Sequence, residues 1–203
     1  MLWQCRSDVL ACLSAARRCL ILALVLNVTL VLTAHAFERP SSPQILPAQG
    51  TLEAVFSPWD DVEARLIDVL AEAHREVLVQ AYILTSKPLI LALIGAHQRG
   101  VDVQVLLDGA QLSPTGIERL AMLQGAGIEV TLETKYQSAH NKVLIIDAAT
   151  AEATVITGSY NFTWSAQHKN AENILIARGN APLAARYAAN WRRHFFDAKP
   201  AVH

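Results

Sequence analysis

The chain has 203 residues, 52% of them hydrophobic, and its 17 Lys and Arg against 18 Asp and Glu give a formal net charge of −1 at pH 7. This length suits one domain with a hydrophobic core, and the near-neutral charge gives no support to a large polyanion-binding surface. Cys5, Cys12 and Cys19 all lie near the N-terminus, so the rest of the chain excludes a disulfide framework, a thiol nucleophile and a cysteine-based zinc site.

The first 36 residues have the pattern of a secretory signal peptide. Three arginines and one acid precede an apolar run over 19–33, and Ala34-His35-Ala36 is a small-x-small sequence that suits signal peptidase. We expect cleavage after Ala36 and a secreted or periplasmic protein, whose 14 basic and 17 acidic residues carry a charge of −3. A retained N-terminal membrane anchor is the alternative, although the run is shorter than the about 20 residues of a spanning helix. A mitochondrial targeting segment is the third interpretation.

The next segments predict an irregular lead-in followed by a helix and a strand. Residues 37–50 contain three prolines and Gly50, which is typical of irregular structure. Ser57-Pro58-Trp59-Asp60 has a cap, a proline and an acid in the order of a helix start. Apolar residues at helical spacing over 62–73 continue that pattern, and residues 77–84 predict a strand.

The middle of the chain predicts two further helix and strand pairs. Ser86-Lys87-Pro88 opens a helix that we expect to stop near Gly100, before a strand over 101–107. Ser113-Pro114 opens the next helix, before a strand over 128–132.

The last third predicts three strands and a C-terminal helix. The strands are expected over 143–146, 153–157 and 173–177, and Asn180-Ala181-Pro182 leads into the helix. Alternating helices and strands predict one α/β domain over 51–198, with a mixed sheet flanked by helices on both faces. Trp59, Trp164 and Trp191 are expected to anchor the core, with Trp164 the one candidate for stacking on a nucleic-acid base.

One short run of residues has the pattern of a catalytic motif. His140, Lys142 and Asp147 form the pattern HxK(x)4D around the apolar run Val143-Leu144-Ile145-Ile146, which predicts a buried strand. Because side chains alternate across a strand, we expect His140 and Lys142 to project to the same face, about 7 Å apart along the backbone. An imidazole and an ammonium group at that spacing can converge on one phosphate.

These residue types suit attack on an anionic phosphodiester. Imidazole is a competent nucleophile near neutral pH. Lys142 would reduce the repulsion between that nucleophile and the phosphate, and stabilise charge that builds on its oxygens. Glu172 suits a role in holding the second ring nitrogen of His140. Taken singly, each residue is more often structural, and a turn or capping role is expected for Asp147.

The combination resembles the phospholipase D superfamily, in its short single-motif branch of small secreted bacterial endonucleases. The signature of that superfamily is HxK(x)4D followed by a GS-x-N stretch, and the resemblance covers roughly residues 51–196. It is carried by His140, Lys142, Asp147, Gly158, Ser159, Asn161 and Glu172, with Ala81-Tyr82, Ser86-Lys87-Pro88 and Arg99-Gly100-Val101-Asp102-Val103 upstream.

The resemblance implies a metal-independent phosphodiesterase that needs no cofactor. His140 would form a phosphohistidine, and a second histidine would protonate the leaving oxygen. Since the chain has one copy of the motif, the resemblance predicts a homodimer with a shared active site. Lys142 and Asn161 would bind the phosphate oxygens with support from Ser159, and Asp147 would be more structural than catalytic.

Three functions remain open on the sequence alone. The leading hypothesis is a non-specific endonuclease on DNA or RNA, for which Lys169 is a further substrate-binding candidate. The alternative is a phospholipase D that hydrolyses phospholipid head groups, such as those of phosphatidylcholine or cardiolipin. The third hypothesis is a non-catalytic binding protein with the same fold.

Overall fold

The computed structural model of the chain describes residues 43–201. The predicted signal peptide over 1–36, with its three cysteines, and the first part of the lead-in lie outside the described residues. The chain divides into two units at Ile45, and all elements below belong to the unit that begins at Leu46. Residues 43–49 have no regular secondary structure and Gly50 is a bend.

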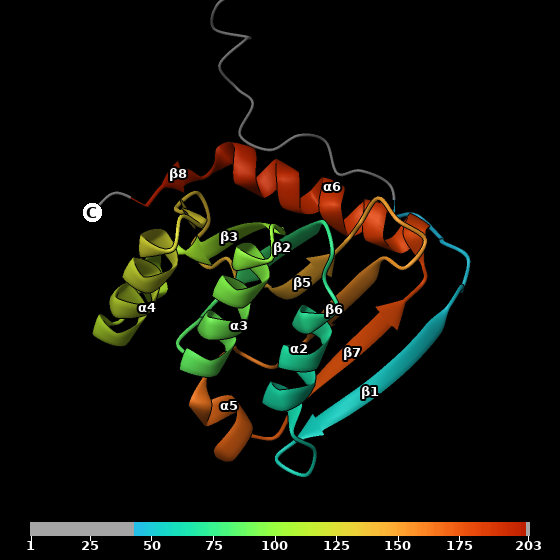
Figure 1. The fold of residues 1–203 in the computed structure, drawn as a ribbon, viewed down its shortest axis with the longest axis horizontal. Coiled ribbons are helices and arrows are strands. Elements are labelled where there is room, and N and C mark those ends of the chain that lie inside the picture. Colours follow the sequence, from blue (N-terminus) through green and yellow to red (C-terminus); the bar gives the residue numbers. More distant parts are fainter. Residues whose placement is uncertain (1–42, 202–203) are drawn as a thin grey trace, which may run out of the picture. The chain divides into compact units, whose positions relative to one another are not determined.

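The described residues form one mixed eight-stranded sheet in the order β1-β7-β6-β5-β2-β3-β4-β8 (Figure 1). Strands β2, β3 and β4 are parallel, and the other neighbours are antiparallel. The bounds are β1 Thr51–Ser57, β2 Glu76–Ala81, β3 Asp102–Asp108, β4 Glu129–Glu133, β5 Lys142–Ile146, β6 Thr154–Gly158, β7 Glu172–Arg178 and β8 Lys199–Pro200.

Helices cover both faces of this sheet, so the predicted fold class is confirmed. Helices α2, α3 and α4 lie side by side over one face, and α6 crosses the other (Figure 1). The short helix α5 lies at one end of the sheet, below α2 and α3 in the view of Figure 1. The bounds are α2 Val62–Ala71, α3 Lys87–Gln98, α4 Pro114–Gly125, α5 Trp164–His168 and α6 Ala181–Asp197, with a 3-10 turn at Gly109–Gln111.

The core has two layers because neighbouring residues of a strand point to opposite faces. Val77 and Val79 of β2 pack under α2 and α3, whereas Leu78 between them packs under α6. Trp191 of α6 is buried in the second layer, and its indole N–H donates to the carbonyl of Val79, 2.9 Å away. Strands buried on both faces read as continuous apolar runs, which is why β2 and β5 were recognisable in the sequence.

Three predicted helix starts are confirmed by their caps. The side chains of Ser86, Ser113 and Asn180 accept hydrogen bonds from backbone N–H groups in the first turns of α3, α4 and α6, and a proline follows each cap within two residues. The helix α3 ends at Gln98 and is followed by Gly100 at a φ of 91°, as the expected stop near this glycine requires.

The helix start predicted at Ser57-Pro58-Trp59-Asp60 is wrong. Ser57 is the last residue of β1, and α2 begins at Val62 with Asp61 as its cap. The hydroxyl of Ser57 donates to the carbonyl of Ala166 in α5, 2.8 Å away, and therefore does not cap a helix. The strand β1 was not predicted, because only Val55 and Ser57 of its residues are buried and its alternation is weak.

The expectation that three tryptophans anchor the core is correct for Trp191 only. Trp59 and Trp164 are exposed to solvent. Both belong to segments that the sequence did not predict correctly, the turn after β1 and the short helix α5.

Candidate active site

The predicted catalytic residues meet at one end of the sheet. Strands β2 and β6 end there, and β5 and β7 begin there, because β5 is antiparallel to β2 and β6 to β7. In the register, Lys142 at the start of β5 pairs with Ala81 at the end of β2. Gly158 at the end of β6 pairs with Ile174, near the start of β7.

His140 and Lys142 are in direct contact. The Lys142 Nζ lies 3.1 Å from His140 Nδ1 and donates to the His140 carbonyl oxygen, also 3.1 Å away. Strand β5 begins at Lys142, so His140 precedes the strand and its side chain is exposed while that of Lys142 is buried. Within residues 43–201, His140 Nε2 makes no hydrogen bond, so this nitrogen is available to a substrate.

Tyr82 is a neighbour of this pair that the sequence did not single out as a site residue. Its ring centroid lies 4.3 Å from that of His140, and Lys142 Nζ lies 4.9 Å from the Tyr82 centroid. The backbone N–H of Tyr82 donates to the Asn141 carbonyl at 2.8 Å. Tyr82 therefore packs against both side chains and restricts where the imidazole can lie. The sequence prediction placed Tyr82 inside a strand over 77–84, whereas β2 ends at Ala81, so its place beside His140 was not visible in the sequence.

The charge of Lys142 is influenced by two opposing effects. Burial lowers the pKa of its ammonium group below the ordinary lysine value of 10.5, because the charged form loses hydration. The carboxylate of Glu172 acts in the opposite direction and favours the charged form. Lys142 is thus a desolvated cation that interacts with the predicted nucleophile on one side and with an acid on another.

Glu172 lies at the start of β7 and is partly buried. Its carboxylate accepts a hydrogen bond from the Asn170 side-chain amide at 2.9 Å. The described residues include no hydrogen bond between Glu172 and His140, so the role of this acid in orienting the imidazole stays a prediction.

The Gly158-Ser159 pair holds β6 close to β7. A Cβ at Gly158 would lie 2.1 Å from the carbonyl oxygen of Asn173, so only glycine permits this approach. Ser159 Oγ then accepts hydrogen bonds from Asn173, from the backbone N–H at 3.1 Å and from the side-chain amide at 3.3 Å. Ser159 therefore holds the start of β7, and its predicted role in supporting the phosphate-binding residues stays a prediction.

Asn161 follows this strand end and carries an unsatisfied polar atom. Its Oδ1 is buried and has no hydrogen-bond partner in the described structure. A buried polar atom without a partner costs about 1–3 kcal/mol. Rotation of the side-chain amide by 180° exchanges the positions of its oxygen, which accepts, and its NH2 group, which donates. Asn161 can therefore offer either group to a ligand.

Asp147 lies at the opposite end of β5 from Lys142. Its carboxylate accepts three backbone hydrogen bonds, from the N–H groups of His74 at 3.0 Å, Arg75 at 2.7 Å and Glu76 at 2.9 Å. Its own φ is 51°, a left-handed conformation that aspartate tolerates better than most residues. Asp147 thus ties the end of β5 to the segment that enters β2, the turn position that was expected for it.

Lys169 lies outside the cluster around His140. It follows α5 with an exposed side chain, and its Nζ lies 5.3 Å from the ring centroid of Trp164. The same indole stacks on His168 with centroids 4.5 Å apart and planes 11° from parallel.

Metal binding and membrane crossing concern the same described residues. No group of three or more His, Cys, Asp and Glu within 43–201 could hold a metal ion. None of the helices in this part of the chain has the length and apolar character needed to cross a bilayer.

Comparisons with known proteins converge on one family. The family model described as "Cardiolipin synthase, PLD-like domain" matches residues 66–195. The "Phospholipase D" of Rickettsia prowazekii is 36% identical over 144 residues, which is 71% of this chain and 67% of the relative. The "Mitochondrial cardiolipin hydrolase" of Xenopus tropicalis is 29% identical over 71% of this chain and 66% of its own length. Among solved structures, Nuc from Salmonella typhimurium, a phospholipase D family member, superposes with a TM-score of 0.71 and 25% identity, over 75% of this chain and 99% of Nuc.

Proposed function

Because the chain belongs to the phospholipase D superfamily and is a phosphodiester hydrolase of that superfamily, we propose that its reaction runs through a phosphohistidine on His140. The observation that supports this proposal is the contact between the exposed imidazole of His140 and the buried ammonium group of Lys142. A nucleophile beside a desolvated cation is what attack on an anionic phosphodiester requires.

In the first step, a ring nitrogen of His140 forms a bond to phosphorus and the bond from phosphorus to the leaving alcohol oxygen breaks. Attack through Nε2 requires the ring proton on Nδ1, to which an ammonium group cannot donate, so Lys142 turns from Nδ1 to the phosphate oxygens in this step and the Nδ1–H group needs another acceptor. Glu172 is the candidate acceptor, because its carboxylate interacts electrostatically with Lys142, whose ammonium group lies beside Nδ1. Lys142 and Asn161 bind the phosphate oxygens during this step.

A second histidine gives the leaving alcohol its proton. In the second step the same histidine takes a proton from water, which attacks phosphorus and releases His140 and a phosphate monoester. We propose that this histidine is His140 of another copy of the chain, in a homodimer whose two-fold axis passes through the shared site. The exposure of His140 in the single chain supports this arrangement.

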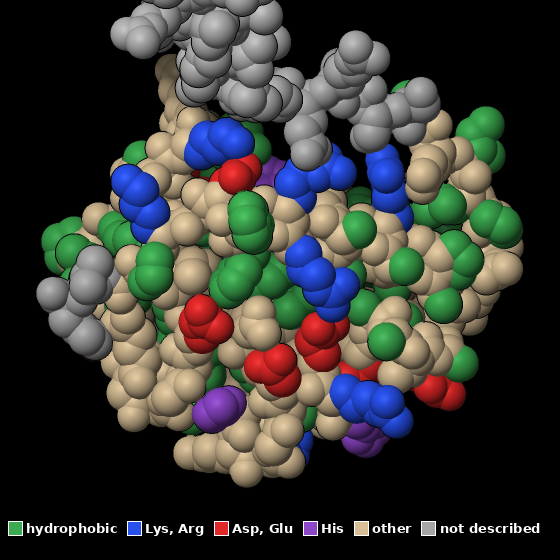
Figure 2. Space-filling model, turned by 90° about the horizontal axis from the view of Figure 1, so that it is seen from above, with side chains coloured by type: hydrophobic (Ala, Val, Ile, Leu, Met, Phe, Trp, Pro, Cys, Tyr) green, Lys and Arg blue, Asp and Glu red, His purple; other side chains and the backbone are tan. Residues whose placement is uncertain are grey.

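Among phosphodiesters, phospholipids are the first candidate substrates. Relatives that cover most of the domain are named phospholipase D and cardiolipin hydrolase. The face over α6, drawn in Figure 2, carries acidic side chains among its basic ones and so is not a uniform surface for a polyanion. The charge of −3 over 37–203 agrees with this.

Nucleic acid, the substrate of the non-specific endonuclease expected from the sequence, is the second candidate substrate. The compact single-motif chain and the predicted export signal favour it, because small secreted endonucleases share both features. The non-catalytic alternative is not retained, since His140, Lys142, Asn161 and Glu172 are all present and the named relatives are hydrolases.

One pair of assays tests the proposal. Purified protein and His140→Ala are compared in EDTA, on plasmid DNA and on vesicles of phosphatidylcholine, phosphatidylglycerol and cardiolipin. Release of head groups by the wild type alone, with no metal, is the expected result. Plasmid nicking by the wild type alone would select the second candidate. Equal activity of His140→Ala would remove the phosphohistidine mechanism.

A further inference from the structure

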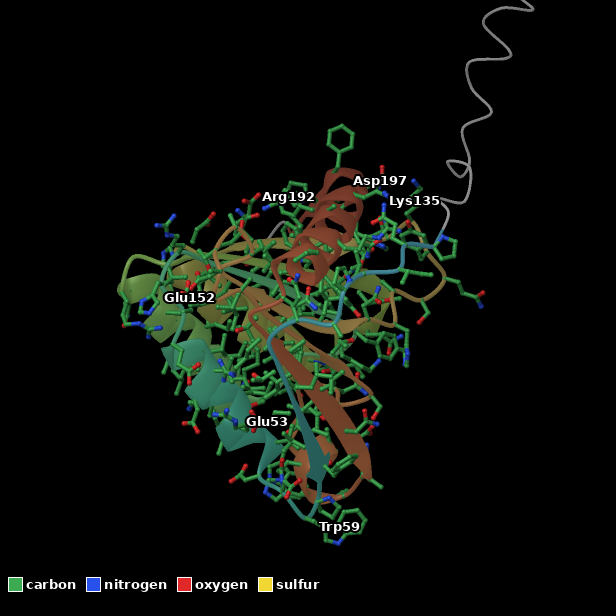
Figure 3. The ribbon with its side chains drawn as sticks, turned by 90° about the vertical axis from the view of Figure 1, so that its right-hand side faces the viewer. Glu53, Trp59, Lys135, Glu152, Arg192 and Asp197 are labelled. Carbon is green, nitrogen blue, oxygen red and sulfur yellow. The ribbon has the colours of Figure 1, made fainter. Side chains whose placement is uncertain are left out.

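Two exposed tryptophans lie on adjoining segments at the active-site end of the sheet. Trp59, in the turn after β1, is 83% exposed, and Trp164, in α5, is 55% exposed. Trp59 projects into solvent at the end of β1, next to α5 (Figure 3). We refer to Trp59 and Trp164 as the aromatic tip. Exposed large rings at one place are costly in water, and in soluble domains they mark a surface that binds something.

The aromatic tip is held rigidly. The turn after β1 is joined to α5 by hydrogen bonds from Ser57 Oγ to the Ala166 carbonyl at 2.8 Å and from Gln167 Nε2 to the Asp60 carbonyl at 2.9 Å. The carboxylate of Asp60 accepts from the N–H of Phe56 at 2.8 Å, which closes the turn. The exposure of the rings is therefore built into the fold and does not depend on a loose loop.

The tip is continuous with the active site. In the register of β1 and β7, Ser57 pairs with Glu172 and Phe56 pairs with Asn173. Asn173 in turn donates to Ser159, and Asn170 at the end of the α5 segment donates to Glu172. A surface that contacts the tip therefore lies beside the residues proposed to hold and attack the phosphodiester.

We propose that the aromatic tip docks the protein on the surface of a phospholipid bilayer and so presents membrane lipids to the active site. Indole and phenyl rings favour the region where head groups meet acyl chains, because they combine a large apolar area with a polar or polarisable edge. Lys169 lies over the Trp164 ring, so that its stem accompanies the indole while its ammonium group can meet lipid phosphates.

Local charge and ring geometry favour a bilayer over a nucleic acid. The tip carries Asp60 and Asp61 as well as Lys169, so it offers no positive surface of the kind that drives nucleic-acid binding. A base-stacking platform needs an open ring face, whereas the Trp164 ring already stacks on His168. Docking through apolar rings also depends little on salt, in contrast to phosphate contacts.

The docking proposal rests on the proposed function. A membrane substrate and a soluble substrate are therefore used to test the two separately. The full-length wild type, Trp59→Ala and Trp164→Ala are assayed on phosphatidylcholine vesicles and on bis(p-nitrophenyl) phosphate, a soluble phosphodiester. The matched control is Phe196→Ala, which removes a ring that is 90% exposed on α6. Because all variants keep the same N-terminal residues, differences between them report on the substituted ring alone.

Both tip variants are expected to lose about tenfold in turnover of vesicle lipid, as removal of one interfacial ring predicts. Their turnover of the soluble phosphodiester, and both activities of Phe196→Ala, should match the wild type. Brominated phosphatidylcholine should quench the fluorescence of the wild type more than that of Trp59→Ala, equally at low and high salt.

Three results would overturn the docking proposal while the proposed function stands. These are unchanged vesicle turnover in both tip variants, a loss confined to single-stranded DNA cleavage at low salt, and a change of oligomeric state in light scattering. No turnover of the soluble phosphodiester by the wild type would instead count against the proposed function.

Discussion

The ammonium group of Lys142 lies 3.1 Å from the Nδ1 atom of His140, and the first side chain is buried while the second is exposed. The pair therefore joins the interior of the sheet to its surface at the active-site end. The cation is held in place by the strand that carries it, and the imidazole can reach a substrate from solvent. Each of the following predictions depends on this arrangement or on the strands that support it.

Replacement of His140 by alanine should abolish turnover without loss of stability. Loss of a covalent nucleophile costs at least about a thousandfold in kcat. The side chain is exposed, so its removal leaves no cavity in the core. Activity and thermal unfolding are measured on the same preparation. A variant that retains more than a few per cent of wild-type turnover would contradict the assignment of the nucleophile.

The alkaline limb of the pH profile of kcat/KM should follow the deprotonation of Lys142. Burial lowers the pKa of this ammonium group below 10.5, and Glu172 partly opposes that effect. If the charged form binds phosphate, activity is present below the lowered pKa and is lost as pH rises through it. Glu172→Gln should move this limb to lower pH, and Lys142→Arg should remove it because arginine stays charged. The measurement is kcat/KM against pH.

The lowered pKa of Lys142 also predicts the direction in which the free energy of unfolding changes with pH. Between the lowered pKa of Lys142 and its ordinary value of 10.5, the unfolded chain binds the proton more tightly than the folded chain. The free energy of unfolding contributed by this group therefore increases as pH rises through that window. Denaturant unfolding of the wild type and of Lys142→Met across this range should differ in slope with that sign.

Removal of the Asp147 carboxylate should destabilise the protein far more than it affects catalysis. Asp147→Ala leaves three backbone N–H groups without their acceptor, and a loss of roughly 3 kcal/mol in the free energy of unfolding is expected. Asp147→Asn keeps an acceptor and tolerates the positive φ, so it should lose less. Denaturant midpoints measure the losses, and kcat of the folded variants serves as the control. A large fall in kcat with unchanged stability would assign Asp147 to catalysis instead.

A methyl group at Gly158 should disturb the site through the strand next to it. The added Cβ would lie 2.1 Å from the Asn173 carbonyl oxygen, so β6 and β7 have to separate. We expect Gly158→Ala to lose about 1–3 kcal/mol of stability, as overpacking does, together with much of its activity. Gly125→Ala is the matched control, because nothing lies within 4 Å of its Cβ. Equal behaviour of the two variants would show that close approach is not what selects glycine at 158.

A shared active site should be visible in mixtures of subunits. If two copies of His140 form one site, a wild-type subunit paired with His140→Ala is inactive. Activity of re-equilibrated mixtures should then fall below the fraction of wild-type chain, and light scattering should give the mass of a dimer. A monomer with full activity would refute the homodimer.

Local patterns determined where α3, α4 and α6 start and where the buried strands lie. Ser86, Ser113 and Asn180 cap their helices through atoms within three residues of themselves, and the prolines beside them act just as locally. The continuous apolar run in β5 identified a strand buried on both faces for the same reason, since every residue in it is apolar.

Contacts between distant residues decided the start of α2. Ser57 has the composition of a helix cap, but its hydroxyl finds the carbonyl of Ala166, which lies 109 residues further along the chain. No local pattern contains that partner. The exposure of Trp59 and Trp164 has the same origin, because it follows from how this turn and α5 pack together.

The sequence by itself determined which groups can do chemistry, and that His140 and Lys142 are neighbours, because only Asn141 lies between them along the chain. Only the tertiary structure decided what surrounds them. Tyr82 and Glu172 reach this pair from the ends of other strands, and Gly158 is needed because Asn173 lies against it. These relationships depend on strand order and register, which arise from long-range pairing and burial. Residue spacing along one chain does not contain that information.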